Sequence, residues 1–281
     1  MNSKVSAPAD RLQQVAGRTW RPGIFLWLQL GLHGVALMLW AMGYWPGALA
    51  LVLVSHLAMM ASGLWPRSTW MGQTWVRLPD AARCRHEVAI TIDDGPDPEV
   101  TPFVLDILAR YEVQASFFCI GTRAAQYPQL CRAMVAAGHR VENHGQNHPT
   151  LLSMRGLRGW RREVAEGQQT LHGITGQRPQ FYRAVAGLRN VFLDPVLCQL
   201  GLQLASWTRR GFDTREADPQ RVLARLTRGL GPGDVLLLHD GHAARMADGT
   251  PVIVSVLPRL IEALRERGLK PVTLVHACKT D

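Results

Sequence analysis

Two long apolar runs stand near the start of the chain, and shorter apolar runs alternate with polar ones over the remainder. Residues 22–66 contain no Asp, Glu, Lys or Arg, and within them residues 24–42 and 48–65 are each close to the ~20 apolar residues that cross a bilayer. Glycine and proline in residues 43–47 favour a tight turn between the runs. The pattern predicts a transmembrane helical hairpin over residues 23–66, preceded by an N-terminal segment over residues 1–22.

Two other structures fit this pattern less well. A hairpin buried in a soluble protein requires a core that covers both helices on every side. A cleaved signal peptide has a shorter apolar region of about 7–15 residues, with no second run directly behind it. Tryptophan also favours the membrane, because seven of the nine tryptophans lie in the first 75 residues, most of them near the expected helix ends.

The basic residues on either side of the hairpin predict its orientation, because positively charged flanks stay in the cytoplasm. The turn between the runs has no basic residue, whereas both flanks have several: Lys4, Arg11, Arg18, Arg21, Arg67, Arg77, Arg83 and Arg85. We therefore expect a multi-pass protein of a bacterial-type inner (cytoplasmic) membrane, with residues 1–22 and the C-terminal domain on the cytoplasmic side.

Cysteine usage and charge agree with this location. Five cysteines without a C-x-x-C pair argue against a disulfide framework and favour a reducing compartment. The net charge of +9 suits an anionic membrane surface better than nucleic acid, since basic residues alternate with acidic ones and no aromatic-basic binding motif is found.

Beyond a linker expected over residues 67–85, strand-like runs alternate with helix-like segments, which predicts an α/β domain with a mostly parallel sheet over residues 86–281. The expected strands are residues 88–92, 115–120, 140–143, 180–183, 202–207, 235–239 and 271–276. The expected helices include residues 102–111, 128–137, 157–171, 219–230 and 252–267. The candidate functional residues fall at or just after carboxyl ends of strands, where barrel-type α/β folds collect their active sites.

Two carboxylates and two imidazoles form the first candidate group. Asp93 and Asp94 end an apolar run at a Gly-Pro turn, and His144 and His148 stand four residues apart, so one helical turn would aim both imidazoles at one point. With a carboxylate from Asp93 or Asp94 they form a two-His, one-carboxylate set suited to a divalent transition metal. The histidines that we interpret as packed or surface residues are His33, His56, His86, His139, His172, His242 and His276.

The chain from about Glu87 to the C-terminus resembles the polysaccharide deacetylases with a NodB-homology domain, carbohydrate esterase family 4. T-I-D-D-G-P at residues 91–96 matches the family's first motif, T-F-D-D-G-P, and implies that Asp93 is the catalytic base and Asp94 a metal ligand. His144 and His148 match H-[ST]-x-x-H as the other two ligands, with glycine in place of Ser or Thr. The resemblance implies an irregular (β/α) barrel of NodB type behind the hairpin.

Three further motifs assign the remaining roles by resemblance. Arg183 begins R-A-V-A-G, similar to R-x-P-x-G with Val185 in place of proline, and would hold the base in its ionised form. The backbone N–H of Ala186 would be the oxyanion donor. Asp213 is similar to the fourth motif's acid, which orients a catalytic histidine, and L-L-L-H-D at residues 236–240 makes His239 the general acid.

The resemblance implies a metal-dependent carbohydrate N-deacetylase, with zinc as the expected ion and cobalt, nickel or manganese as alternatives. The metal would acidify water and polarise an acetamide, Asp93 would accept the water's proton, and His239 would protonate the departing amine. The expected partner is an acetylated amino-sugar glycan or glycolipid at the membrane, and no nucleic acid. The alternatives are an extracytoplasmic deacetylase of peptidoglycan, exopolysaccharide or chitin-like oligomers, and a non-catalytic glycan-binding or assembly protein on the same fold.

Overall fold

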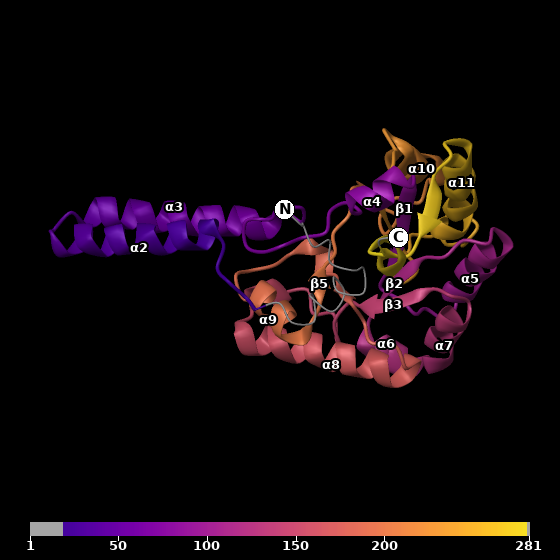
Figure 1. Ribbon diagram of the computed structural model, residues 1–281, viewed down its shortest axis with the longest axis horizontal. Helices are drawn as coiled ribbons and strands as arrows, with labels where there is room; N and C mark the ends of the chain where they lie inside the picture. The colour runs from indigo at the N-terminus through magenta and orange to yellow at the C-terminus, as the bar shows by residue number, and fades with distance from the viewer. Residues whose placement is uncertain (1–18, 280–281) are drawn as a thin grey trace, which may run out of the picture.

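A computed structural model describes residues 19–279 of the chain. Most of the predicted N-terminal segment, including Lys4, Arg11 and Arg18, lies outside the described residues. The described part consists of a helical hairpin that projects from one side of an α/β domain (Figure 1).

The two apolar runs form helices α2 (Ile24–Ala41) and α3 (Trp45–Leu64), which lie side by side in the hairpin (Figure 1). The turn is shorter than predicted, because α3 begins at Trp45 with a proline in its first turn, where proline is tolerated. Most large apolar side chains of the hairpin are exposed; Leu28 and Leu53, for example, are each 60% exposed. The hairpin thus lacks the surrounding core that a soluble buried hairpin requires, and both helices have the length and hydropathy of a membrane span.

One sheet of eight parallel strands runs through the described part of the domain. The strands are β1 (Glu87–Asp93), β2 (Ser116–Cys119), β3 (Arg140–Asn143), β4 (Phe181–Tyr182), β5 (Gln203–Leu204), β6 (Arg209–Arg210), β7 (Val235–His239) and β8 (Lys270–Val272). Their order is β5-β4-β3-β2-β1-β7-β6, and β8 pairs with the start of β1. The predicted α/β class and parallel sheet are confirmed.

The two ends of this strand order are joined by one short stretch of chain. β5 and β6 lie at opposite ends of the order, yet only residues 205–208 separate them in the sequence. That stretch spans less than about 20 Å even when extended, whereas a flat sheet of seven strands would be about 29 Å wide. The sheet therefore has to curl, which produces the irregular barrel that the resemblance implied.

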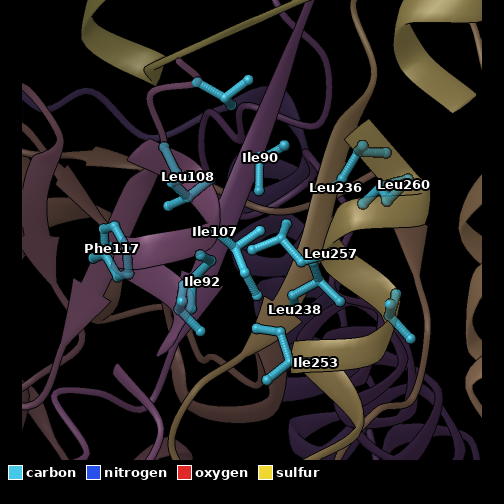
Figure 2. Close-up of a cluster of buried hydrophobic side chains, with 14 of the residues drawn as sticks. Ile90, Ile92, Ile107, Leu108, Phe117, Leu236, Leu238, Ile253, Leu257 and Leu260 are labelled. Atoms are coloured by element: carbon cyan, nitrogen blue, oxygen red, sulfur yellow. The ribbon is translucent and has the colours of Figure 1, made fainter. Parts of the chain in front are cut away.

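The two faces of β1 separate the main hydrophobic core from the barrel interior. Ile90 and Ile92 pack with Leu236 and Leu238 of β7 against helix α11 (Val252–Glu266) (Figure 2). Because successive side chains of a strand alternate in direction, the neighbouring Asp93 belongs to the interior face. Burial of each such aliphatic side chain stabilises the fold by about 1.5–3 kcal/mol. The strand that ends in Asp93 is therefore firmly held.

The other described helices precede, connect or follow the strands and pack against the sheet. They are α4 (Asp80–Cys84), α5 (Thr101–Arg110), α6 (Gly121–Gln126), α7 (Pro128–Ala136), α8 (Leu157–Thr175), α9 (Leu193–Leu200), α10 (Pro219–Thr227) and α12 (Leu274–Ala277). The predicted strand over residues 271–276 is wrong beyond Val272. Thr273 caps α12 there by accepting a hydrogen bond from the His276 N–H, and this local cap outweighs the strand propensity of the segment. β6, α6 and α9 were not predicted, since such short elements carry too little periodicity.

The hairpin meets the domain in a close backbone contact. The Arg189 N–H donates to the Gly63 carbonyl oxygen over 3.2 Å, and a Cβ at Gly63 would lie 2.3 Å from the Arg189 oxygen, so only glycine fits at this helix end. Arg189 also donates to Thr74 Oγ1 over 2.7 Å. Further along residues 67–85, the Trp75 N–H donates to the carbonyl oxygen of Leu204 in β5 over 2.8 Å. This segment, predicted as a linker, therefore lies along the domain.

Candidate functional site

The carboxylates of Asp93 and Asp94 contact different partners at the end of β1. Asp93 Oδ1 accepts a hydrogen bond from Arg183 Nη1 over 2.6 Å. Asp94 Oδ1 lies 3.2 Å from His144 Nε2 and 3.1 Å from His148 Nε2. Asp94 has a left-handed φ of 73°, which turns the chain sharply after the strand. The residue spacing left the choice of carboxylate open and the resemblance implied Asp94; the structure brings Asp94 to both imidazoles.

An irregular loop, not the predicted helical turn, brings the two imidazoles together. Residues 144–148 follow β3 without helical structure, and Gly145 and His148 have φ angles of 90° and 54°. The ring centroids of His144 and His148 are 4.8 Å apart. The four-residue spacing predicted that the rings would meet, but the local structure differs because positive φ angles interrupt a helix.

Glu163 of α8 holds this loop in place and was missed in the sequence. Its carboxylate accepts hydrogen bonds from the backbone N–H groups of Asn147, over 2.5 Å, and His148, over 2.9 Å. A Cβ at Gly145 would lie 2.8 Å from Glu163 Oε1. Glu163 thus supplies loop contacts at the position where the motif's hydroxyl side chain is missing. It lies 15 residues after His148, within an amphipathic helix, and no local pattern marks it.

Asp94, His144 and His148 fit a divalent metal ion. One ligand atom from each lies within 4.8 Å of the others, and the two short distances match the roughly 3.3 Å between neighbouring ligands of tetrahedral zinc. His144 Nδ1 is 2.8 Å from the Arg183 carbonyl oxygen. That oxygen can only accept, so Nδ1 carries a proton, and in the neutral imidazole Nε2 turns its lone pair toward Asp94. Two acceptors at 3.2 Å attract a cation between them.

The titration behaviour of these groups also favours a cation. Burial lowers the pKa of His144, but Asp93 and Asp94 outweigh it and raise the pKa above its ordinary value. The pocket around the three ligands is therefore negative enough to favour a positive charge, either a proton or a metal ion.

A third imidazole, that of His242, also reaches Asp94, although we interpreted this histidine as a packed or surface residue. Its Nδ1 lies 3.4 Å from Asp94 Oδ2, and its Nε2 accepts from Arg123 Nη2 over 3.1 Å. Burial pushes the pKa of Asp94 upward, but His144, His148 and His242 together hold it well below its ordinary value. The sequence marks His242 only by its position, three residues after His239 of the fifth motif.

Arg183 is fully buried beneath Asp93 at the end of β4. Besides the ion pair, it donates to Thr91 Oγ1 over 2.8 Å, and its guanidinium lies 4.0 Å from the ring centroid of Phe118. Burial lowers the pKa of Arg183, and Asp93 counteracts the effect. A buried guanidinium of this kind needs its carboxylate partner, so the pair fixes the orientation of Asp93.

His239 and Asp213 form a second buried pair beside the first. His239 Nδ1 lies 2.9 Å from Asp213 Oδ1, and the His239 backbone N–H donates to Asp213 Oδ2 over 2.7 Å. Burial lowers the pKa of His239, but Asp213 outweighs it and raises the pKa above its ordinary value. In the register between β1 and β7, Asp93 stands opposite His239. A carboxylate and an imidazole with separate partners therefore face one another across neighbouring strands.

Ala186 lies in the short 3-10 turn η2 (Val185–Gly187), just after Arg183. It is exposed and has a φ of 53°. Each predicted site residue is thus found at the carboxyl end of the sheet or in the loops that follow it, as the sequence predicted.

Comparisons with known proteins agree with this geometry. Residues 80–205 match the polysaccharide deacetylase family. The chain is also 35% identical over 199 residues to a chitooligosaccharide deacetylase of Sinorhizobium fredii, an alignment that covers 68% of this chain and 91% of the relative. The chain belongs to the polysaccharide deacetylase family. This confirms the resemblance drawn from the motifs.

The comparisons also include a second relative and a solved structure, both from Bacillus species. A peptidoglycan-N-acetylglucosamine deacetylase of Bacillus cereus is 30% identical over 66% of this chain and 85% of its own length. A solved structure from Bacillus anthracis, described as a pseudoenzyme of carbohydrate esterase family 4, superposes with a TM-score of 0.66. At 21% identity over 74% of this chain and 69% of that chain, it shows the shared fold alone.

Proposed function

We propose that this protein is a membrane-anchored, metal-dependent hydrolase that removes an N-acyl group, most simply acetyl, from an amino sugar of a glycan or lipid-linked saccharide. One observation carries the proposal: three metal-type ligands lie beside a carboxylate held by Arg183 and an imidazole held by Asp213. A binding protein places no demand on this combination, whereas amide hydrolysis needs a base, an acid and charge stabilisation together.

The residues divide the reaction between them. Asp94, His144 and His148 would hold the cation, which when bound supplies Lewis acidity that acidifies water and polarises a carbonyl. Asp93 accepts the proton of the attacking water, and its pairing with Arg183 aims the carboxylate. His239 donates a proton to the departing amine, and Asp213 stabilises the imidazolium that makes this donation available. The backbone N–H of Ala186 donates to the developing oxyanion.

Activity and metal dependence can be measured on the full-length protein in detergent. We expect acetate release and a new free amine from chitooligosaccharides, loss of both after chelation, and recovery on adding zinc, with cobalt, nickel and manganese as comparisons. A metal-loaded, folded protein that binds the oligosaccharide without releasing acetate would instead favour a non-catalytic glycan-binding role.

The Asp213→Asn variant tests the role of the His239–Asp213 pair through pH. A general acid must be protonated, so kcat/KM falls as pH rises through the pKa of His239. Because the Asp213 carboxylate raises that pKa, its loss should shift the alkaline limb of the pH profile to lower pH. If the alkaline limb of the kcat/KM profile is unchanged in Asp213→Asn, His239 is not the general acid.

We place the catalytic domain on the cytoplasmic side of the membrane. The exposed apolar surface of α2 and α3 supports insertion of the hairpin, and the basic residues on both flanks support an inward-facing domain. Alkaline phosphatase fused after Asp281 should be inactive, and a fluorescent protein that matures only in the cytoplasm should fluoresce. The reverse result would favour an extracytoplasmic deacetylase of peptidoglycan, exopolysaccharide or chitin-like oligomers. Among these substrates, peptidoglycan is the one named for the Bacillus cereus relative.

A further inference from the structure

A pocket of about 490 Å³ lies where the end of the hairpin meets the segment around β6 and the C-terminal end of α10. None of the described residues that line it is an Asp or a Glu. The arginines that line it are Arg67, Arg209, Arg210, Arg225 and Arg228. Five guanidinium groups around one concave surface make it a strongly positive site.

Nearby carboxylates neutralise only part of this charge. Arg209 Nε pairs with Asp234 Oδ2 at 3.0 Å, and Arg225 Nη2 pairs with Glu216 Oε2 at 3.1 Å. The other three lining arginines make no ion pair with any residue in the range 19–279: Arg67, Arg210 and Arg228. The pocket therefore keeps an excess of positive charge that a bound anion would balance.

Arg210 is held against two aromatic rings of the pocket. Its guanidinium lies over Trp207 and Phe212, 5.4 Å and 5.0 Å from the ring centroids. No carboxylate pairs with it among the described residues, so its positive charge is available to a bound anion.

The pocket adjoins the end of the hairpin, and two of its aromatic side chains lead toward the residues that hold the proposed catalytic groups. Trp65, which directly follows α3, lines it at the membrane side. On the other side the ring of Trp207 lies 6.0 Å from the Arg183 guanidinium, and Phe212 directly precedes Asp213, the partner of His239. An anion in the pocket would therefore be one aromatic side chain away from Arg183, the partner of Asp93, and close to the end of the hairpin.

We propose that this pocket binds the phosphate or diphosphate of a lipid-linked saccharide, whose amino sugar then reaches the catalytic groups. Several arginines around one cavity match the fork-shaped donors that bind phosphate oxygens, and a lipid-linked phosphate lies at the depth where the hairpin leaves the bilayer. This inference rests on the proposed deacylase function and extends it to the carrier of the sugar. A bulk anionic phospholipid offers the same phosphate chemistry, but a general attraction to it needs no concave cluster of arginines.

The first test compares two substrates of the full-length, zinc-loaded protein. One is N-acetylglucosamine on a polyprenyl diphosphate, and the other is neutral chitotriose. Arg210→Gln and Arg228→Gln should each lower the ratio of kcat/KM for the lipid-linked over the neutral substrate by about tenfold, the usual effect of losing one charge-assisted hydrogen bond. Arg221→Gln is the matched control, since Arg221 lies on α10 but outside the pocket, and should leave the ratio unchanged.

The second test measures binding without turnover, so that it also decides the matter if the deacylase function fails. Chelator-treated wild type is bound to phosphatidylcholine nanodiscs that contain either polyprenyl diphosphate or phosphatidylglycerol at matched charge, each against a neutral disc. We expect tighter binding of polyprenyl diphosphate, at least a tenfold loss in Arg228→Gln, and none in Arg221→Gln. Equal response to both lipids, or equal loss in both variants, would overturn the pocket and leave a general anionic-lipid contact. No deacetylation of either substrate by wild type would overturn the proposed function alone.

Discussion

Asp93→Asn should lower kcat by about 10²–10⁴, the usual contribution of a positioned base, while the metal stays bound. The substitution keeps the shape of the side chain and leaves Asp94, His144 and His148 untouched. The measurements are acetate release under saturating substrate and metal content of the purified protein. Near-normal turnover would assign the base elsewhere, and a loss of metal as large as in Asp94→Asn would mean that both aspartates are ligands.

Asp93→Asn also has an expected cost in stability. The Arg183 guanidinium is fully buried, and breaking such a pair costs about 3–5 kcal/mol. Asparagine retains one acceptor oxygen, so the loss should be smaller than in Asp93→Ala. Thermal unfolding of both variants separates this effect from the loss of the base, provided that the activity is measured well below the unfolding transition.

His144→Ala or His148→Ala should remove most of the bound metal and abolish detectable turnover, because either change leaves two ligands where three converge. His148→Ala is the cleaner test. Its side chain is 20% exposed, whereas that of His144 is 3% exposed and also donates to the Arg183 carbonyl oxygen. Metal content by elemental analysis and thermal unfolding in the absence of metal are the readouts.

The matched control is His172→Ala, an exposed histidine on α8 away from the ligands. It should keep full metal content and activity. Full metal occupancy and turnover in both His144→Ala and His148→Ala would contradict the assignment of the site.

The sequence predicted the parts of this fold and site that depend on local patterns. Residues 140–143 and 235–239 were predicted with the bounds of β3 and β7, since apolar runs between turn signals are typical of buried parallel strands. Asp93 and His239 end such strands and Asp94 follows directly, so their meeting at one edge followed from strand direction. The choice between Asp93 and Asp94 depends on the left-handed turn at Asp94, which no spacing reveals.

Contacts between segments that are distant in the sequence could not be predicted from local patterns. Glu163 and His242 reach the site from α8 and from the loop after β7, and each looks like an ordinary surface residue in its own segment. The arginine pocket likewise combines residues of the hairpin end, β6 and α10. The curl of the sheet brings these segments together. It follows from the strand order, which the sequence patterns do not show because β6 was not predicted.

The tight contact between Gly63 and Arg189 has a consequence for how far this protein reaches. A flexible tether lets a catalytic domain sample a wide zone above a membrane. Here the last turn of α3 touches the domain backbone without room for a side chain, so a hairpin seated in a bilayer would hold the catalytic mouth at one height and one tilt. Such an enzyme would meet substrates only at a fixed distance from the membrane surface. Its substrates would have to arrive by lateral diffusion within the membrane, and lengthening the junction should widen the range of soluble substrates at the expense of those carried by lipid.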